Sequence, residues 1–391
     1  MYTEKRSSAR SQRIRKFYHG KVKNIVIAPV DSGLLGIIIF LTVFGTLAVF
    51  SAAAPEGLRL FNNPFYFTVK HLVFVAIGVL LLVFSSRIDY KKWKDWSGPL
   101  AAVVIFLIAA TLIPGLGKTE YGSSRWLTFL PIQPSELAKI ACVVLGSKAL
   151  SEAKTLWNDK IILNFGLIAV MMLIIILQPN LSIFLLLGLT CVAMLLAGGM
   201  TPVPVITAII CTLPILAYKI LSTPYQLKRV TGWLNPFEDP QGTGYNLIQS
   251  WYAIASGGLF GVGFGNSKQK LFWLPFGHTD FIFSVIAEEL GFIGCVILIG
   301  FFIALVNKGF QISRRCPDSF GKLLAFGITF IIAVQAFINM GVATGVLPVT
   351  GVTLPLISYG GTSVMVTMVM LGILLNISRK RIKRIMPNER Q

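Results

Sequence analysis

Apolar runs of about 20 residues recur along most of this 391-residue chain, and no other feature restricts its fold as strongly. Hydrophobic residues make up 54% of the sequence and charged residues only 13%, which is about half of the charged fraction of an ordinary soluble domain. A soluble multidomain protein is therefore excluded. The pattern predicts an all-α polytopic membrane protein, because about 20 apolar residues are enough for one helix to span a bilayer.

Ten runs are long enough to be transmembrane helices. They cover residues 32–53, 66–85, 97–115, 134–150, 161–179, 181–199, 202–220, 281–305, 322–345 and 353–376. The first run precedes a sequence similar to a signal-cleavage site, but its length favours a retained helix. The chain is thus expected to consist of a basic arm (1–31), a ten-helix membrane domain (32–376) and a basic tail (377–391).

The distribution of positive charge predicts the orientation of these helices. Twenty-five of the 35 Lys and Arg residues lie in the arm, the tail and alternate connections, all of which would share one side of a membrane. By the positive-inside rule both termini are cytoplasmic. The net charge of +19 is explained in the same way, so no nucleic-acid partner is predicted.

One long connection, residues 221–280, is expected on the extracytoplasmic side between the seventh and eighth helices. Loops of this length are usually functional, and its many Gly, aromatic and apolar residues favour an ordered, membrane-associated loop over a solvated one. Leu247, Trp251 and Ile254 have the spacing of one helix face, which predicts an amphipathic helix within the loop.

Ionisable residues at the ends of apolar runs are costly and are therefore candidates for function. Glu136 and Lys139 stand one helical turn apart at the start of the fourth run, either as a mutually neutralising ion pair or as groups presented to an extracytoplasmic cavity. Asp280 precedes the eighth run, where it could cap the helix. Alternatively, neighbouring apolar surface would raise its pKa and suit it to act as a general base.

The remaining acids give weaker signals. Glu288 and Glu289 lie deeper in the eighth run and point about 100° apart, so one of them is expected to pair with another helix. The sequence Glu238-Asp239-Pro240 is more typical of a turn than of a catalytic site.

Basic residues on the extracytoplasmic side include Arg125, Lys228 and Arg229. Their fixed positive charge and directed donors are what a pyrophosphate requires, although exposed basic residues are usually just solvated. The chain has no nucleotide-binding or hydrolase motif, which argues against ATP-driven transport.

Several sequence blocks occur together in a fixed order over residues 30–376. They are Ser124-Arg125-Trp126-Leu127, Gln133-Pro134-Ser135-Glu136-Leu137-Ala138-Lys139, Arg229-Val230, Asn235-Pro236, Asp239-Pro240, Gly244-Tyr245, Gln249-Ser250, Gly257-Gly258-Leu259, His278-Thr279-Asp280-Phe281-Ile282-Phe283, Glu288-Glu289-Leu290-Gly291, Leu347-Pro348-Val349-Thr350-Gly351, Leu354-Pro355 and Ser358-Tyr359-Gly360-Gly361-Thr362-Ser363. With these blocks the chain resembles the SEDS family (shape, elongation, division and sporulation), the membrane glycosyltransferases that include FtsW and RodA. Residues 263–271 are more similar to the division member FtsW, with an elongation (RodA-like) or sporulation member as the alternative.

The resemblance implies a peptidoglycan glycosyltransferase. Such an enzyme polymerises lipid II into β-1,4 glycan strands on the outer face of the cytoplasmic membrane, releases undecaprenyl pyrophosphate and, as a division member, builds the septal wall. By correspondence with the family, Asp280 is the catalytic base of this inverting reaction. The candidate ligands of lipid II or its pyrophosphate are Arg125, Glu136, Lys139, Lys228, Arg229, His278 and Thr279. A divalent cation, Mg²⁺ or Mn²⁺, is also implied, and Glu136 would either orient Lys139 or help to hold this ion.

The resemblance further implies a multi-pass protein of the bacterial cytoplasmic membrane, at the division septum. Its expected partners are a class B penicillin-binding protein with transpeptidase activity and other division-complex membrane proteins. Two functions of other classes remain open, a lipid II flippase or transporter and a non-catalytic activator of a transpeptidase. The ionisable candidates lie at the outer end of the helices rather than at the membrane midplane, which favours extracytoplasmic chemistry over transport.

The chain departs from the family pattern at two positions. Phe276 stands where the family commonly has Glu, and Asn180 stands where it usually has Asp. The first change removes an acid to which a metal or acceptor contact would be assigned. The second removes a charge, although Asn can still cap the following helix. Neither change affects Asp280.

Overall fold

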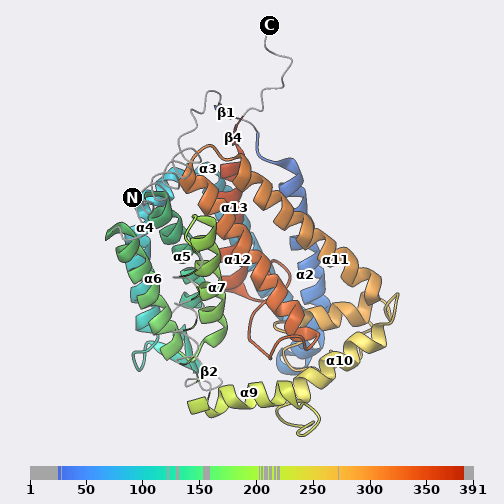
Figure 1. Ribbon diagram of the computed structural model, residues 1–391. Coiled ribbons are helices and arrows are strands. Elements are labelled where there is room, and N and C mark those ends of the chain that lie inside the picture. Colours follow the sequence, from blue (N-terminus) through green and yellow to red (C-terminus); the bar gives the residue numbers. More distant parts are fainter. Residues whose placement is uncertain are drawn as a thin grey trace.

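The computed structural model describes residues 25–27, 29–120, 123–128, 132–152, 159–201, 203, 206, 210, 214, 217, 221–271 and 273–382 (Figure 1). Within these ranges the chain forms a bundle of helices with two small strand pairs. The helices are α2 (Ser32–Phe61), α3 (Tyr66–Arg87), α4 (Tyr90–Ala110), α5 (Pro134–Glu152), α6 (Asp159–Leu177), α7 (Leu181–Ala197), α9 (Pro224–Leu234), α10 (Tyr245–Gly257), α11 (Ile282–Arg315), α12 (Ser319–Ala343) and α13 (Gly361–Ser378). The strands are β1 (Ile25–Ile27), β2 (Gly117–Glu120), β3 (Ser123–Leu127) and β4 (Lys380–Ile382).

The all-helical class predicted from the sequence is confirmed. Nine of the ten predicted spans overlap described helices, although α4 begins and ends before the predicted 97–115 and α11 extends well past 305. The other span, 202–220, lies mostly outside the described residues. Six described helices, α2, α3, α4, α11, α12 and α13, are long and apolar enough to cross a membrane. These six establish a multi-pass membrane protein, and the full count of ten spans remains a prediction.

The last predicted span begins too early in the chain. Residues 353–360 are rich in apolar side chains, but α13 starts only at Gly361. Pro355 has no amide hydrogen to donate, and Leu356 has a positive φ of 64°, so the segment cannot continue as a helix. It nevertheless lies inside the bundle, and α2 passes it so closely that a Cβ at Gly45 would overlap Leu356 O.

The helix α13 lies deepest in the bundle. It is the most buried of the six long helices, whereas α3 packs against it and leaves most of its own apolar surface exposed. The start of α13 also meets the start of α5, because Gln133 N donates to Thr362 Oγ1 at 2.9 Å. This contact brings together the two segments that carry much of the candidate site.

The two ends of the bundle differ in structure. At one end β1 pairs with β4, so the segments next to both termini lie together (Figure 1). At the opposite end α9 and α10 lie across the bundle, within the region predicted to be a long loop. The predicted amphipathic helix is confirmed as α10, with Leu247 buried and Trp251 Nε1 donating to Thr344 O at 3.1 Å. The pairing of β1 with β4 agrees with both termini lying on one side of a membrane.

Glu288 and Glu289 both have partners within the protein. Glu288 accepts a hydrogen bond from Ser267 Oγ at 2.5 Å. Glu289 accepts one from Ser51 Oγ of α2 at 2.6 Å and pairs with Lys270 at 2.7 Å. The prediction that one of these acids pairs with another helix is therefore confirmed. Together the two acids hold the loop before α11 against the bundle.

Replacing Lys270 with Met is expected to lower the free energy of unfolding by roughly 3 kcal/mol, because the buried carboxylate of Glu289 loses its counter-charge. Lys268→Met is the matched control, since Lys268 is exposed. The measurement is thermal unfolding of the purified protein in detergent. The midpoint should fall for Lys270→Met alone, and equal midpoints for the two variants would contradict the assigned role of the ion pair.

Candidate functional site

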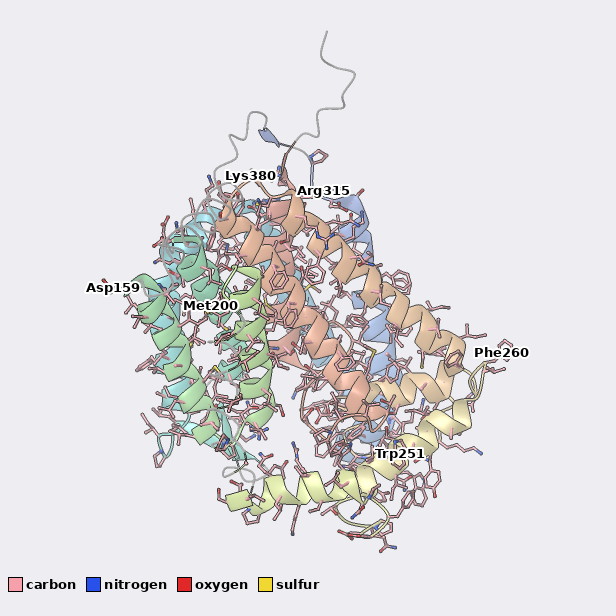
Figure 2. All side chains as sticks on the ribbon, viewed as in Figure 1. Asp159, Met200, Trp251, Phe260, Arg315 and Lys380 are labelled. Atoms are coloured by element: carbon pink, nitrogen blue, oxygen red, sulfur yellow. The ribbon has the colours of Figure 1, made fainter. Side chains whose placement is uncertain are left out.

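A cavity of about 1150 Å³ lies at the end of the bundle that α9 and α10 cover. Its wall is formed by α3, β3, the start of α5, α9, the turn before α11 and the segment before α13. Figure 2 labels Trp251 at this end of the molecule and Arg315 and Lys380 at the opposite end. Six of the eight predicted site residues lie on the wall, namely Arg125, Glu136, Lys228, Arg229, Thr279 and Asp280.

Asp280 is positioned by a tight turn that precedes α11. Its backbone amide donates to Phe276 O at 3.1 Å, and Phe276 itself has a φ of 58°. Asn339 Nδ2 of α12 donates to Asp280 O at 2.9 Å. Ser358 Oγ, from the segment before α13, donates to Thr279 O at 2.6 Å. The backbone of the turn is thus fixed by two neighbouring segments, while the side chain of Asp280 remains on the cavity wall.

The carboxyl group of Asp280 does not cap α11. The N-cap of this helix is Phe281, and among the described residues none donates a hydrogen bond to the Asp280 carboxyl. Burial raises the pKa of Asp280 to about 6, while the charges of Arg229, His278 and Arg125 act in the opposite direction. At neutral pH the group is therefore ionised and able to accept a proton, which favours the general base over the helix cap.

Three predicted cations share the cavity wall with Asp280. Arg125 is held by its Nη2, which donates to Pro179 O at 2.7 Å, while its buried Nε has no hydrogen-bond partner in the described part of the chain. Burial and the charge of Arg229 lower the pKa of Arg125. Arg229 follows Lys228 on α9 and lies over the ring of Tyr225, 4.6 Å from its centre. Positive charge with unused donors is suited to an anion such as a phosphate.

Glu136 and Lys139 form an ion pair at the start of α5. Lys139 Nζ lies 2.5 Å from Glu136 Oε2 and donates to Gln335 Oε1 of α12 at 2.8 Å. Glu136 reaches the cavity wall, but Lys139 is fully buried and does not line the cavity. The structure therefore gives no support to direct contact between Lys139 and a ligand. Sequence spacing could not reveal this, because it does not show which side of α5 faces the cavity.

His278 also lies off the cavity wall. Its Nδ1 is 3.2 Å from Glu56 Oε2, on the part of α2 that continues past the predicted end at residue 53. Its ring centre lies 5.2 Å from that of Phe67 and 5.5 Å from that of Tyr359. The His278 side chain thus supports the turn that carries Asp280, whereas its predicted role as a ligand has no support.

Sequence analysis missed a cation of the cavity wall and two amides that hydrogen-bond to predicted site residues. Lys70 of α3 lines the cavity as a further cation, and its Nζ donates to Tyr66 OH at 2.6 Å. A lysine within a predicted membrane span was the signal that could have identified it. Gln335 and Asn339 are uncharged residues within a long apolar run, so the sequence contained no comparable signal for them.

Asp239, a weak candidate in the sequence, and Asn180, which departs from the family pattern, both have defined hydrogen-bond partners. Asp239 lies on the cavity wall, but its Oδ2 accepts from Thr243 N at 2.8 Å, in agreement with the interpretation as a turn. Asn180 caps α7, with Oδ1 accepting from Ile183 N at 3.4 Å. The expectation that Asn can replace Asp as the cap is therefore confirmed.

The described residues contain no group of three or more His, Cys, Asp and Glu side chains that could hold a metal ion. Glu136, Asp239 and Asp280 share the cavity wall, but Glu136 is already paired with Lys139 and Asp239 already accepts from Thr243 N. Because Mg²⁺ and similar ions require several oxygen ligands, these residues do not form a site for a divalent cation by themselves. No chemical step is therefore assigned to a metal.

Arg229→Leu is expected to raise the pKa of Asp280 above about 6, because loss of a nearby positive charge favours the neutral carboxyl form. The measurement is an infrared titration of the carboxyl band that disappears in Asp280→Asn. Lys268→Met, which changes an exposed lysine away from the cavity wall, is the control and should leave the titration unchanged. A lowered pKa in Arg229→Leu would contradict the assigned electrostatics.

Known proteins share both the sequence and the fold of this chain. A family model that covers FtsW, RodA and SpoVE, described as "Cell cycle protein", matches residues 32–383. The probable peptidoglycan glycosyltransferase FtsW of Geobacter metallireducens is 38% identical, over 90% of this chain and 96% of the relative. The stage V sporulation protein E of Bacillus subtilis is 40% identical, over 89% of this chain and 97% of the relative.

A solved structure described as "Structural coordination of polymerization and crosslinking by a peptidoglycan synthase complex" contains a chain with a similar fold. The TM-score is 0.74 and the sequence identity 30%, over 90% of this chain and 98% of that chain. The family model, the relatives and this structure all cover nearly the whole membrane domain. The chain therefore belongs to the FtsW, RodA and SpoVE family of cell cycle proteins, the SEDS family.

Proposed function

We propose that this chain is a peptidoglycan glycosyltransferase of the FtsW type, which polymerises lipid II into β-1,4 glycan strands and releases undecaprenyl pyrophosphate. The names of its relatives supply the reaction class. One structural observation carries the proposal for the site. The carboxylate of Asp280 receives no hydrogen bond from any described residue, and it lies in the same cavity as the cations Arg125, Lys228 and Arg229.

Glycosyl transfer with inversion needs one base and a stabilised leaving group. Asp280 takes the proton of the acceptor hydroxyl while that oxygen forms a bond to the anomeric carbon of the donor. The bond from this carbon to the pyrophosphate oxygen breaks on the opposite face, so an α-linkage becomes a β-linkage. The electron pair leaves with the pyrophosphate, whose charge Arg125 and Arg229 stabilise. No covalent enzyme intermediate is required.

The proposed cellular setting follows from the two ends of the bundle. The end with β1 and β4 is cytoplasmic by the positive-inside rule, so the cavity at the opposite end faces outward, in a topology of ten spans. A class B penicillin-binding protein is the proposed partner, supported by the likeness to a chain of a peptidoglycan synthase complex. Relatives named FtsW favour a role at the division septum, and similarity to the stage V sporulation protein keeps sporulation as the alternative.

Asp280→Asn is expected to lower glycan polymerisation by about 100-fold or more, because the amide has nearly the same shape but cannot accept the proton. Purified protein bound to its cognate penicillin-binding protein is given lipid II and Mg²⁺, and the glycan is measured on gels. Asp159→Asn is the control, since Asp159 is exposed at the start of α6 and does not line the cavity. Equal polymer from wild type and Asp280→Asn would exclude Asp280 as the base. No polymer from wild type would favour a flippase or an activator of the transpeptidase.

Polymerisation is also expected to fall as the pH is lowered through about 6, because protonation removes the basic form of Asp280. Initial rates between about pH 5 and pH 8 measure this dependence. In Arg229→Leu the polymerisation rate should begin to fall at a higher pH than in wild type, since the charge of Arg229 lowers the pKa of Asp280. A rate that stays constant through this range would contradict the assignment of the base.

A further inference from the structure

The helix α12 carries two buried amides, Gln335 and Asn339, to which the proposed reaction gives no role. Residues four apart lie on the same face of a helix. Gln335 is 1% exposed and Asn339 is 0% exposed. A buried amide in an apolar bundle costs free energy unless it has hydrogen-bond partners, so the partners indicate what each amide holds in place.

Gln335 connects the Glu136–Lys139 pair to the cavity wall. Its Oε1 accepts from Lys139 Nζ at 2.8 Å, and Lys139 in turn contacts Glu136 at 2.5 Å. Its Nε2 donates to Thr353 O at 2.9 Å and to Ser363 Oγ at 3.3 Å. Thr353, Ser363 and Glu136 all line the cavity, so Gln335 lies behind three wall residues at once.

Asn339 holds the turn that carries Asp280. Its Nδ2 donates to Asp280 O at 2.9 Å and to Val352 O at 2.7 Å. Val352 precedes Thr353, so the two amides of α12 bind consecutive carbonyl groups of one irregular segment. The helix therefore supports Asp280 through one amide and the Glu136–Lys139 pair through the other.

We propose that Gln335 and Asn339 are positioning residues that together fix the distance between Asp280 and the Glu136–Lys139 pair. Neither amide is among the residues that line the cavity, so each acts through the group it holds. The inference rests on the proposed glycosyl transfer, in which the base must meet a substrate bound at another part of the cavity wall, where Glu136 lies. A displacement of about 1 Å between such groups lowers the rate of a reaction by about 100-fold.

The two amides should affect different kinetic parameters. Asn339→Leu is nearly isosteric but leaves Asp280 O without its donor, so kcat should fall about 10- to 100-fold with little change in KM. Gln335→Met keeps the side-chain length but loses the bonds to Lys139 and Thr353, so KM for lipid II should rise about tenfold. Initial rates of the partner-bound protein at varied lipid II concentrations measure both parameters.

Thr329→Val is the matched control on the same helix. Thr329 is buried, and its hydroxyl donates to Ala325 O of α12 itself, at 2.7 Å. Its replacement removes a buried hydrogen bond without touching either side of the cavity, so kcat and KM should remain those of wild type. If Thr329→Val reproduces either effect, the change belongs to the packing of α12, and the inference is overturned.

Two measurements that need no turnover distinguish positioning from a loss of folded protein. Without its bond to Asn339, the Asp280 turn can move towards water, so the pKa of this carboxyl should fall by about one unit in an infrared titration of Asn339→Leu. In an Asp280→Asn background, Gln335→Met should weaken the binding of fluorescent lipid II by about tenfold. A smaller fraction of folded protein would change neither the pKa nor the dissociation constant.

These measurements also separate the inference from the proposed function. If wild type makes no polymer, but Asn339→Leu shifts the titration and Gln335→Met weakens binding, then positioning holds and the polymerase assignment fails. If wild type polymerises lipid II but both variants retain its kcat, KM, titration and binding, then the polymerase assignment holds and the positioning role is overturned. A wild type that does not bind lipid II would overturn the role of Gln335 together with the proposed substrate.

Discussion

A non-helical segment can lie inside an apolar helical bundle only if its backbone groups find partners there, and the candidate site depends on how residues 352–360 meet this requirement. Asn339 and Gln335 of α12 donate to two consecutive carbonyl groups of the segment. Ser358 connects the segment to the turn before α11 by donating to the carbonyl group that precedes Asp280. The hydrogen bonds that provide partners for the backbone of this irregular segment therefore also place the Asp280 carboxyl group on the cavity wall.

The acids within the bundle and at its cavity have three kinds of surroundings. Glu288 is held by hydrogen bonds from Ser267 Oγ and Lys268 N. Glu136 and Glu289 are each paired with a lysine, at 2.5 Å and 2.7 Å, and these pairs hold separate parts of the bundle together. Asp280 has no such pair among the described residues, and burial raises its pKa to about 6. Pairing neutralises a buried charge and contributes to structure, whereas an unpaired carboxylate near neutral pH retains its capacity to accept a proton.

Sequence analysis located the charged half of the site better than its supports. Asp280 and Arg125 were found because ionisable residues are rare in such a chain and because the family motifs include them. The prediction of a helix over residues 353–360 was wrong for a different reason. Apolar composition does not distinguish a membrane helix from a buried irregular segment. Lys139 and His278 were predicted as ligands from the family motifs, and a motif does not show which neighbour a side chain contacts. In the structure Lys139 contacts Glu136 and His278 contacts Glu56.

Composition and charge by themselves determined that this chain is a multi-pass helical membrane protein, and its motifs determined the family. Composition, charge and motifs are properties of the sequence itself, so they can be determined without knowing which helices are in contact. Only the tertiary structure decided that Glu136 faces the cavity while Lys139 is buried beneath it, and that two uncharged amides of α12 support both sides of the site. The physical reason is that a buried polar group is satisfied by whichever residues packing brings to it, and here those residues lie in distant segments of the chain.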